Sequence, residues 1–415
     1  MIPRIIDQVD VANKRVFVRG DFNVPQSEDG QITDDRRIRL TVATIESILS
    51  RGGSVVLASH LGRPAGGAYE AAFSLAPVAA RLRELSPLLK DLTLVGQRCT
   101  DATVATATAA LRPGGALLIE NLRFETGEKK GDVALAATLA NYADIYCNDA
   151  FGASHRGDAS MLALPAAMRA QGKPCAAGFL LAREIRYLSG VLDRPEKPFV
   201  AIVGGAKVSD KLIALRNLCG RVDTILVGGA MAYTFLKALG SPVGRSLVQQ
   251  QMLDEARAIL SHAAATSTSI VLPFDHVCGE ALALGTLTQV VVGAIPDALM
   301  GLDIGPATVA KFSAVVRGAR TIVWNGPLGA FETAPFQEGT FAVIEAVLEA
   351  TRAGATSIAG GGDTAAAVGA AGASEGFSHI STGGGASLEM LEGKEFECLN
   401  ALDSLSPVGY SGSRK

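Results

Sequence analysis

Arginine and histidine side chains stand beside turn-forming residues in five short segments of the first half of the chain. These segments are Arg19–Pro25, Asp35–Arg37, His60–Pro64, Asn121–Phe124 and Phe151–Arg156. Guanidinium groups make paired hydrogen bonds to carboxylate and phosphate oxygens, so a cluster of them suits a small ligand that carries both groups. We expect Asp21 and Asn23 to contact a hydroxyl group of the same ligand.

A single histidine is more often a packing residue than a ligand, and a single arginine is usually solvated. Here, however, several arginines fall at predicted strand ends or in adjoining loops of one half of the chain, which favours an anion site over isolated surface charges. They are Arg19, Arg37, Arg63, Arg123 and Arg156.

Glycine replaces arginine as the repeated feature in the second half. Gly204–Lys211 has the sequence GGAKVSDK, follows an apolar run and precedes a helical pattern. If the helix begins within this segment, Lys207 and Lys211 share one face at its N-terminal end. Two cations there oppose the helix dipole, and a bound phosphate explains them. The alternative is a tight turn with solvated lysines. The segment does not match the Walker A pattern.

Two more glycine runs, Gly360–Thr364 and Gly383–Gly385, also precede helical patterns. Glycines let the backbone N–H groups approach a phosphate chain, and Asp363 beside them is a candidate Mg²⁺ ligand. The alternative role for Asp363 is to cap the helix that follows. Trp324–Pro327, together with Glu332, is predicted to line a nucleotide sugar, the alternative being an ordinary Asn-Gly turn.

Short apolar runs typical of buried strands alternate with Ala- and Leu-rich helical patterns. This alternation predicts an α/β fold of two doubly wound domains, each a parallel sheet covered by helices on both faces. Ligands of such sheets bind beyond the carboxyl ends of the strands, where most of the motifs fall. The expected strands are Arg15–Arg19, Ser54–Ser59, Ala116–Glu120, Ile145–Asn148, Phe199–Val203, Thr224–Val227, Ser269–Leu272, Thr321–Trp324 and Thr356–Ala359.

The domain boundary is expected near a long helix, Phe179–Leu192, which the sequence RPEKP at 194–198 breaks. We expect an N-terminal ligand-binding domain at 1–175, an interdomain hinge helix at 176–197 and a nucleotide-binding domain at 198–392. The C-terminal segment, 393–415, is expected to pack back on the N-terminal domain, with a loose tail from Ser404 onward.

Composition excludes several classes of protein. With 415 residues, 48% hydrophobic and 19% charged, the chain is long and apolar enough for two folded domains. A net charge of −3 with neither half strongly basic argues against nucleic-acid binding. No signal peptide and no membrane-spanning apolar run is evident, and the six cysteines are scattered, as in cytosolic proteins. We expect a cytoplasmic monomer.

Taken in order, these motifs make the chain resemble the phosphoglycerate kinase family over about residues 4–396. They are DFNVP at 21–25, HLGRP at 60–64, GGAKVSDK at 204–211, MGLDIGP at 300–306, WNGP at 324–327 and GGDT at 361–364. The resemblance implies reversible, Mg²⁺-dependent transfer of the acyl phosphate of 1,3-bisphosphoglycerate to ADP, giving 3-phosphoglycerate and ATP.

The resemblance also implies residue roles. Glycerate binding falls to Asp21, Asn23, Arg37, His60, Leu61, Gly62, Arg63, Arg123 and Arg156. Nucleotide binding falls to Lys211, Gly301, Asn325, Glu332, Gly361, Gly362, Asp363 and Thr364, with Asp363 on the metal. The groups around the transferred phosphoryl are Arg37, Lys207, Gly383, Gly384 and Gly385.

This sequence departs from the family pattern at several positions. Gly20 stands where the family usually has Val, Asp158 where a His commonly follows Arg156, and Ala65 where a basic residue is common. The sequence beyond Lys394 also differs. None of these positions is assigned to the transferred group.

The expected mechanism needs no protein nucleophile, because an acyl phosphate is already activated. The protein aligns donor and acceptor, stabilises charge on the phosphoryl oxygens and excludes water when its domains close. Two rivals remain. A nicotinamide-dependent dehydrogenase is disfavoured because Gly-x-Gly-x-x-Gly is absent after the first strand. A non-catalytic protein that binds phosphometabolites and nucleotides is the other.

Overall fold

The computed structural model describes residues 3–404, apart from the side chains of residues 192 and 193, and the expected tail beyond Ser404 lies outside these residues. The chain divides into two compact units. The first contains residues 1–185 and 395–415, and the second contains residues 186–394. The division falls inside helix α6 (Phe179–Asp193).

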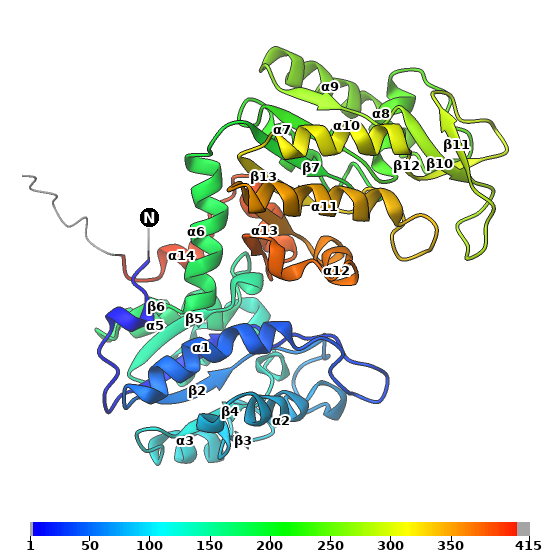
Figure 1. Ribbon diagram of the computed structural model, residues 1–415. Coiled ribbons are helices and arrows are strands. Elements are labelled where there is room, and N and C mark those ends of the chain that lie inside the picture. The colour runs from blue at the N-terminus through cyan, green and yellow to red at the C-terminus, as the bar shows by residue number, and fades with distance from the viewer. Residues whose placement is uncertain (1–2, 405–415) are drawn as a thin grey trace, which may run out of the picture. The chain divides into compact units, whose positions relative to one another are not determined.

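The first unit is built on a six-stranded parallel sheet with strand order β3-β4-β2-β1-β5-β6 (Figure 1). Its strands are β1 (Arg15–Gly20), β2 (Ser54–Ala58), β3 (Thr93–Val95), β4 (Ala116–Ile119), β5 (Ile145–Asp149) and β6 (Cys175–Ala177). Its helices are α1 (Arg36–Ser50), α2 (Ala76–Leu85), α3 (Ala102–Ala109), α4 (Val133–Ala140), α5 (Leu164–Ala170), the first part of α6, and α14 (Glu397–Asn400).

Apolar side chains point to both faces of this sheet. Val16 and Val18 of β1 pack into one core with Ile45 of α1 and Val78 of α2. Phe17, between the two valines, points the other way and stacks on Tyr146 of β5, with ring centroids 6.3 Å apart. Since both faces are covered, the central strands are apolar at nearly every position, which is the pattern that revealed them.

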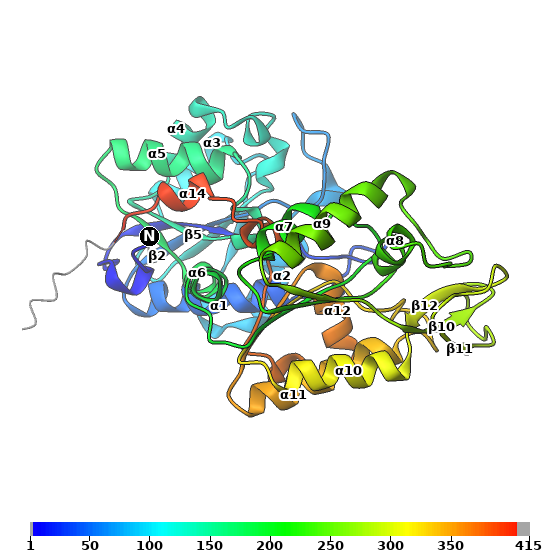
Figure 2. The same ribbon diagram turned by 90° about the horizontal axis from the view of Figure 1, so that it is seen from above.

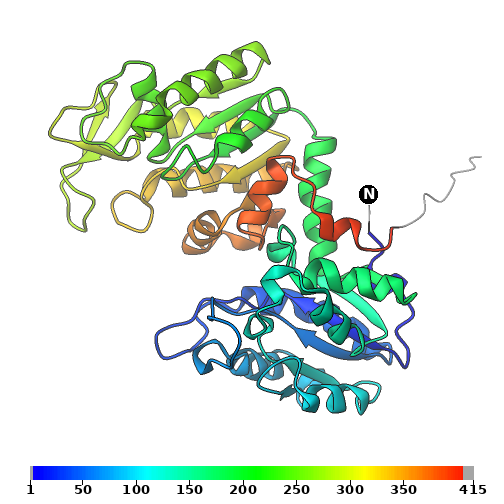
Figure 3. The same ribbon diagram turned by 180° about the vertical axis from the view of Figure 1, so that it is seen from behind.

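The end of the described chain lies beside its beginning in the first unit, as Figure 3 shows. The Arg4 N–H donates to the Asp403 carbonyl at 2.6 Å, and the Asp403 N–H donates to the Cys175 carbonyl at 2.8 Å. The Cys398 thiol of α14 donates to the Ser154 carbonyl at 2.9 Å. The segment after Glu395 therefore belongs to the first unit.

The second unit repeats this architecture, with a six-stranded parallel sheet in the order β15-β14-β13-β7-β8-β9. Its strands are β7 (Phe199–Val203), β8 (Thr224–Val227), β9 (Ser269–Val271), β13 (Thr321–Asn325), β14 (Thr356–Gly360) and β15 (His379–Ile380). Its helices are α7 (Leu212–Leu218), α8 (Met231–Ala238), α9 (Leu253–Ala265), α10 (Pro306–Arg317), α11 (Glu338–Arg352), α12 (Gly362–Ala370) and α13 (Gly385–Leu391). Figure 2 shows α10 and α11 on one face of this sheet and α7, α8 and α9 on the other.

All nine expected strands are present, and the α/β class with two parallel sheets is confirmed. The sequence prediction missed an antiparallel sheet in the second unit, made of β10 (Asp275–Gly279), β11 (Gln289–Val292) and β12 (Met300–Ile304). β10 carries Asp275 and His276 inside the strand, and β11 is largely exposed, so neither forms the continuous buried apolar run that marks a parallel strand.

Within residues 3–404, no helix combines the length and the apolar composition needed to cross a membrane.

Candidate active site

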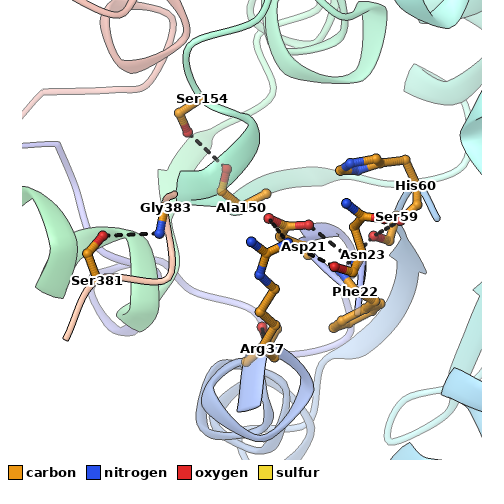
Figure 4. Close-up of polar contacts among 12 residues, drawn as sticks. Asp21, Phe22, Asn23, Arg37, Ser59, His60, Ala150, Ser154, Ser381 and Gly383 are labelled. Atoms are coloured by element: carbon orange, nitrogen blue, oxygen red, sulfur yellow. Dashed lines mark hydrogen bonds and ion pairs between the residues drawn. The ribbon is translucent and has the colours of Figure 1, made fainter. Parts of the chain in front are cut away.

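The glycerate-site residues predicted in the first unit gather at the carboxyl edge of its sheet. Figure 4 shows Asp21, Asn23, Arg37 and His60 of this group. Asp21 and Asn23 follow β1, His60–Arg63 follow β2, Arg123 lies in the turn after β4, and Arg156 follows β5. The order of the strands places β1 between β2 and β5, so these loops are neighbours.

Arg37, in the first turn of α1, closes one side of this group. Its Nη1 lies 3.4 Å from the Asp21 carboxylate and donates to the Asn23 carbonyl at 2.8 Å. The Asn23 side-chain oxygen accepts the Gly62 N–H at 2.8 Å, which joins the loop after β1 to the loop after β2. The Arg37 guanidinium is therefore held at the edge of the site, with about a third of its side chain (31%) exposed.

His60 lies in the middle of the arginine cluster. It is only 1% exposed, and its two ring nitrogens each lie 3.2 Å from a guanidinium nitrogen, one of Arg19 and one of Arg156. Burial, reinforced by Arg19, Arg123, Arg156 and Arg37, holds the pKa of His60 well below its ordinary 6.5. The histidine is therefore neutral, and the positive potential comes from the arginines around it.

Arg123 is partly buried beside His60. Its Nη1 donates to the Gly62 carbonyl at 2.5 Å, whereas its buried Nε has no hydrogen-bond partner among the described residues. Burial and the charge of Arg156 lower the pKa of Arg123, and the carboxylate of Asp158 raises it. A buried donor without an acceptor in a cationic cluster is the feature expected of a site that takes up an anion.

Sequence reasoning missed the residue that holds these loops in place, Asn121. Its side-chain oxygen accepts the N–H groups of Leu61 and Arg123, and its Nδ2 donates to the carbonyls of Leu61 and Phe73. The Leu61 side chain is buried, and its backbone is hydrogen-bonded to Asn121. Arg63, two residues further on, is exposed. In the sequence, an asparagine directly after the predicted buried strand Ala116–Glu120 could have indicated this role.

The structure corrects the prediction for Arg19. Its side chain is completely buried and is hydrogen-bonded to Ser160, Gly20 and His60, so it supports the site from behind rather than facing a ligand. The glycine at position 20, where the family usually has Val, has a local structural explanation. A Cβ atom there would meet the Phe22 ring at 2.7 Å, so a larger residue at position 20 would have to displace this ring.

In the second unit, glycines in the loops after β7 and β8 serve contacts between loops. Gly205 donates to the Pro327 carbonyl at 2.9 Å, and Gly229 donates to the Leu328 carbonyl at 2.8 Å. A Cβ atom on Gly204 would lie 2.0 Å from the Pro327 oxygen. The loops after β7, β8 and β13 thus interlock through their backbones, and glycine is required at these positions whether or not a ligand binds.

The expected shared helix face of Lys207 and Lys211 is wrong, because α7 begins only at Leu212. The loop contacts hold residues 204–210 in an irregular conformation, with Gly205 at φ +110°. Lys207 is exposed and makes no ion pair with any residue in 3–404. Lys211 points inward instead, and its Nζ contacts the Asn325 side-chain oxygen.

Lys211 and Asn325 stand next to the glycine run Gly360–Thr364. Burial lowers the pKa of Lys211, while the nearby carboxylates of Asp363, Asp210 and Glu392 raise it. The Asn325 Nδ2 is buried without a partner among the described residues, and it lies 3.1 Å from the position of a Cβ atom on Gly361. The structure therefore brings Lys211, Asn325, Gly361 and Asp363 together.

Gly361 is the N-cap of α12, with φ +93°, so Asp363 lies inside the first turn and is not the cap. The alternative role for Asp363 is therefore excluded, and its exposed carboxylate is available to a ligand. Gly362 has open space beside it. Thr364 is buried, and its hydroxyl accepts the Gly326 N–H and donates to the Gly360 carbonyl, both at 2.7 Å, which fixes the two loops.

The glycine run Gly383–Gly385 opens α13. The Gly383 N–H already donates to the Ser381 hydroxyl at 3.0 Å (Figure 4). Gly384 is the N-cap, with φ +50°, and both it and Gly385 have open space where a side chain would project. In the part of the chain that the structure describes, the N–H groups of Gly384 and Gly385 make no hydrogen bond, so they are the amides of this run that a ligand can use.

Two further predicted nucleotide residues, Gly301 and Glu332, belong to other segments of the second unit. Gly301 is in β12, where its N–H donates to the Ser246 hydroxyl at 2.9 Å and a Cβ atom would overlap the Tyr233 hydroxyl. Glu332 is exposed in the loop between β13 and α11. Neither has a described hydrogen bond to the other candidate residues.

Three comparisons agree on what this chain is similar to. A family model described as phosphoglycerate kinase matches residues 6–394. The phosphoglycerate kinase of Rhodopirellula baltica is 49% identical over 406 residues, covering 97% of this chain and 100% of that protein. That of Chloroflexus aurantiacus is 46% identical over 403 residues, covering 97% and 99%. Among solved structures, phosphoglycerate kinase from Coxiella burnetii superposes with a TM-score of 0.86 at 39% identity, covering 96% of this chain and 98% of its own. The enzyme from Pyrococcus horikoshii superposes at 0.80 with 28% identity and the same coverage.

Proposed function

We infer that this chain, which belongs to the phosphoglycerate kinase family, transfers a phosphoryl group reversibly between 1,3-bisphosphoglycerate and ADP, giving 3-phosphoglycerate and ATP. The observation that carries this conclusion is the match along nearly the whole chain, in both units, at 49% identity. The arginine cluster of the first unit and the lysine- and glycine-lined edge of the second have the chemistry that such substrates require.

We propose that the first unit holds the glycerate. The Asp21 carboxylate and the Asn23 amide are suited to its hydroxyl, and the guanidinium groups to its carboxylate and phosphate. The support is the clustering of these loops at one sheet edge, with a neutral buried His60 and an unpaired Arg123 Nε among them. The proposed glycerate-binding residues are Asp21, Asn23, Arg37, His60, Leu61, Gly62, Arg63, Arg123 and Arg156.

The second unit is proposed to hold the nucleotide. The grouping of Lys211, Asn325 and Asp363 beside the first turn of α12 supports a phosphate site there, since helix N-termini and lysines both attract phosphate. The proposed nucleotide-binding residues are Lys211, Gly301, Asn325, Glu332, Gly361, Gly362, Asp363 and Thr364. Arg37, Lys207, Gly383, Gly384 and Gly385 are proposed to surround the transferred group.

A magnesium ion fits the donor set of this site. Mg²⁺ in phosphotransferases is commonly held by one or two carboxylates, substrate phosphates and water. Asp363 offers one exposed carboxylate at the start of α12, and residues 3–404 contain no cluster of three or more His, Cys, Asp or Glu side chains that could hold a metal without a substrate. When bound there, the ion would neutralise charge on the nucleotide phosphates.

The chain's own residues then have a simple task. The acyl phosphate is an activated donor, so the protein aligns the reacting oxygens and offsets the charge of the phosphoryl group, with Arg37 and Lys207 as the cations. We propose that the domains, 1–175 and 198–392, close about the hinge helix 176–197 to exclude water.

The six cysteines, all buried free thiols, support a reducing, cytoplasmic setting. We propose a monomer that binds neither nucleic acid nor membrane.

An assay with 3-phosphoglycerate, ATP and Mg²⁺, coupled to an auxiliary dehydrogenase that reduces the acyl phosphate with NADH, tests the function. We expect NADH oxidation that depends on all three components. Calorimetry that detects binding of both substrates, together with no turnover in the assay, would instead support a non-catalytic binding protein.

A further inference from the structure

Two guanidinium groups flank the imidazole ring of His60 on opposite edges. Arg19 Nη2 lies 3.2 Å from Nδ1, and Arg156 Nη1 lies 3.2 Å from Nε2. A guanidinium group has donors and no acceptor. Each of the two ring nitrogens therefore faces a group that can only donate a hydrogen bond.

The ring cannot satisfy both arginines at once. Its burial and the surrounding charges of Arg19, Arg37, Arg123 and Arg156 keep it neutral, so one nitrogen carries a proton and the other a lone pair. Only the nitrogen with the lone pair can accept from its arginine. The N–H of the other ring nitrogen points at an N–H of the second arginine. An acceptor atom of a ligand placed between these two donors would bind both and remove the repulsion between them.

Arg19 is the arginine that cannot move. Its side chain is completely buried, its Nε donates to the Ser160 hydroxyl at 2.8 Å, and its Nη1 donates to the Gly20 carbonyl at 2.5 Å. Ser160 in turn donates its hydroxyl to Glu128 at 2.5 Å and its backbone N–H to the same carboxylate at 3.0 Å. Glu128 is also completely buried; burial raises the pKa of its carboxyl group, and the charge of Arg19 lowers it.

Arg156 is less constrained. It is partly exposed, and among the described residues its guanidinium has no hydrogen-bond partner apart from His60. When the two arginines compete for the single lone pair of the ring, the fixed one determines the outcome and the mobile one adapts.

We propose that the buried chain Glu128–Ser160–Arg19 fixes His60 as the tautomer with its proton on Nε2, so that His60 and Arg156 together donate to one anionic oxygen of the substrate. Arg19, Ser160 and Glu128 are then positioning residues that act through His60 without touching the ligand. The identification of this anion as the glycerate substrate rests on the proposed function, whereas the tautomer itself does not.

Nitrogen NMR of the ligand-free wild-type protein, labelled at histidine, reads the tautomer directly. The chain has five histidines, and the His60→Gln variant identifies the signals of His60 by their loss. We expect a neutral ring with a protonated Nε2 and an unprotonated Nδ1 at pH 7. A proton on Nδ1, or a doubly protonated ring, overturns the proposal even if the protein is a fully active kinase.

Ser160→Ala and Glu128→Gln test the role of the buried chain. Ser160→Ala removes the acceptor of Arg19 Nε, and Glu128→Gln removes the carboxylate that orients Ser160. We therefore expect a mixture of tautomers in the NMR spectrum and a glycerate KM about tenfold higher, the loss expected when one substrate hydrogen bond is no longer well aligned. The nucleotide KM is expected to stay the same. A single unchanged tautomer and an unchanged glycerate KM in both variants would refute the positioning role.

Ser74→Ala is the matched control. The Ser74 hydroxyl donates to the buried carboxylate of Glu120 at 2.5 Å, and the N–H of Leu75 donates to it at 3.1 Å, which reproduces the Ser160–Glu128 pair without an arginine or a histidine attached. We expect Ser74→Ala to lower the melting temperature without changing the His60 tautomer.

If both test variants fail to fold, the wild-type spectrum still decides the proposal. If the spectrum is as expected and the protein has no kinase activity, the tautomer proposal stands and the proposed function fails.

Discussion

Lys207 carries a positive charge that no described carboxylate neutralises, at the end of a buried strand. In the first unit, by contrast, Arg37 pairs with Asp21, and in the second Lys211 contacts Asn325. An exposed, unpaired lysine costs little to keep and remains free to meet an incoming phosphoryl group. Arg37 and Lys211 therefore already have partners within the protein, whereas Lys207 remains available to the substrate.

We predict that Lys207→Ala lowers kcat at least about a hundredfold, as expected when one preorganised charge is removed from a transition state, with a smaller effect on nucleotide KM. Steady-state kinetics of the coupled reaction measure both parameters. Lys237→Ala is the matched control, because Lys237 is an exposed lysine of the same unit, in the last turn of α8. A near-normal kcat for Lys207→Ala would remove Lys207 from the transfer step.

Arg63 is exposed at the edge of the glycerate site, and its side chain has no described partner. We predict that Arg63→Ala raises the glycerate KM about tenfold or more, since a charge-assisted hydrogen bond is lost, and leaves the nucleotide KM unchanged. Arg112→Ala is a suitable comparison, because Arg112 is exposed in the loop before β4, at the opposite edge of the sheet. An unaltered glycerate KM would take Arg63 out of the site.

Asp158 is a carboxylate inside a cationic site. It is 5% exposed, its Oδ2 has no partner among the described residues, and its charge acts on Arg123. We predict that Asp158→Asn lowers the glycerate KM by about threefold or more, because a negative charge no longer opposes the anionic substrate. Asp91→Asn, at an exposed position before β3, is the control. A raised glycerate KM would mean that Asp158 contributes a favourable contact instead.

At the scale of elements, the first turn of α6 is hydrogen-bonded to a buried carboxyl group, that of Asp149. Asp149, at the end of β5, accepts the Leu181 N–H at 3.0 Å, and Phe179 donates to the Thr44 hydroxyl at 2.9 Å, so α6 is tied to the sheet and to α1. Burial raises the pKa of Asp149 from 3.8 to about 7, although its hydrogen bonds with the Leu181 backbone, the Thr44 side chain and the Leu180 backbone lower it. Its second oxygen has no partner among the described residues.

A raised pKa makes the folded state bind a proton that the unfolded state releases. Between pH 3.8 and about pH 7 the fold therefore loses stability as pH rises, by about 1.4 kcal/mol per pH unit at most, and above pH 7 this contribution is constant. Asp149→Asn cannot release a proton. We predict that the free energy of unfolding of the variant, relative to wild type, increases with pH across this window and then levels off.

Chemical denaturation of both proteins between pH 4.5 and pH 8.5 measures that difference, and effects of other ionisable groups cancel in it. A difference that does not vary with pH would show that Asp149 is not protonated in the fold.

The elements were predictable where the physical cause is local. Strands buried on both faces are apolar at successive positions, so the parallel strands were found, whereas the antiparallel sheet β10–β12 gave no such signal. The start of α7 was misplaced because the backbone of Gly205 is held by Pro327, far away in the sequence. Likewise Arg19 and Ser160 are separated by 141 positions, so the sequence could indicate a cluster of arginines but not which of them is buried support.

At the scale of the whole molecule, two units of the same layered architecture carry different chemistry at the carboxyl edges of their sheets. One edge offers arginines on loops fixed by Asn121, and the other offers backbone amides and lysines. The proposal gives the glycerate to the first unit and the nucleotide to the second. Catalysis then requires both substrates on one chain and no residue that carries the phosphoryl group between them.

The stereochemistry at phosphorus tests this claim of direct transfer most directly. The γ-phosphoryl group of ATP, made chiral with three oxygen isotopes, is transferred to 3-phosphoglycerate, and the configuration of the product is determined. A single in-line displacement predicts inversion. Retention would require a second displacement through a phosphorylated side chain and would contradict the account.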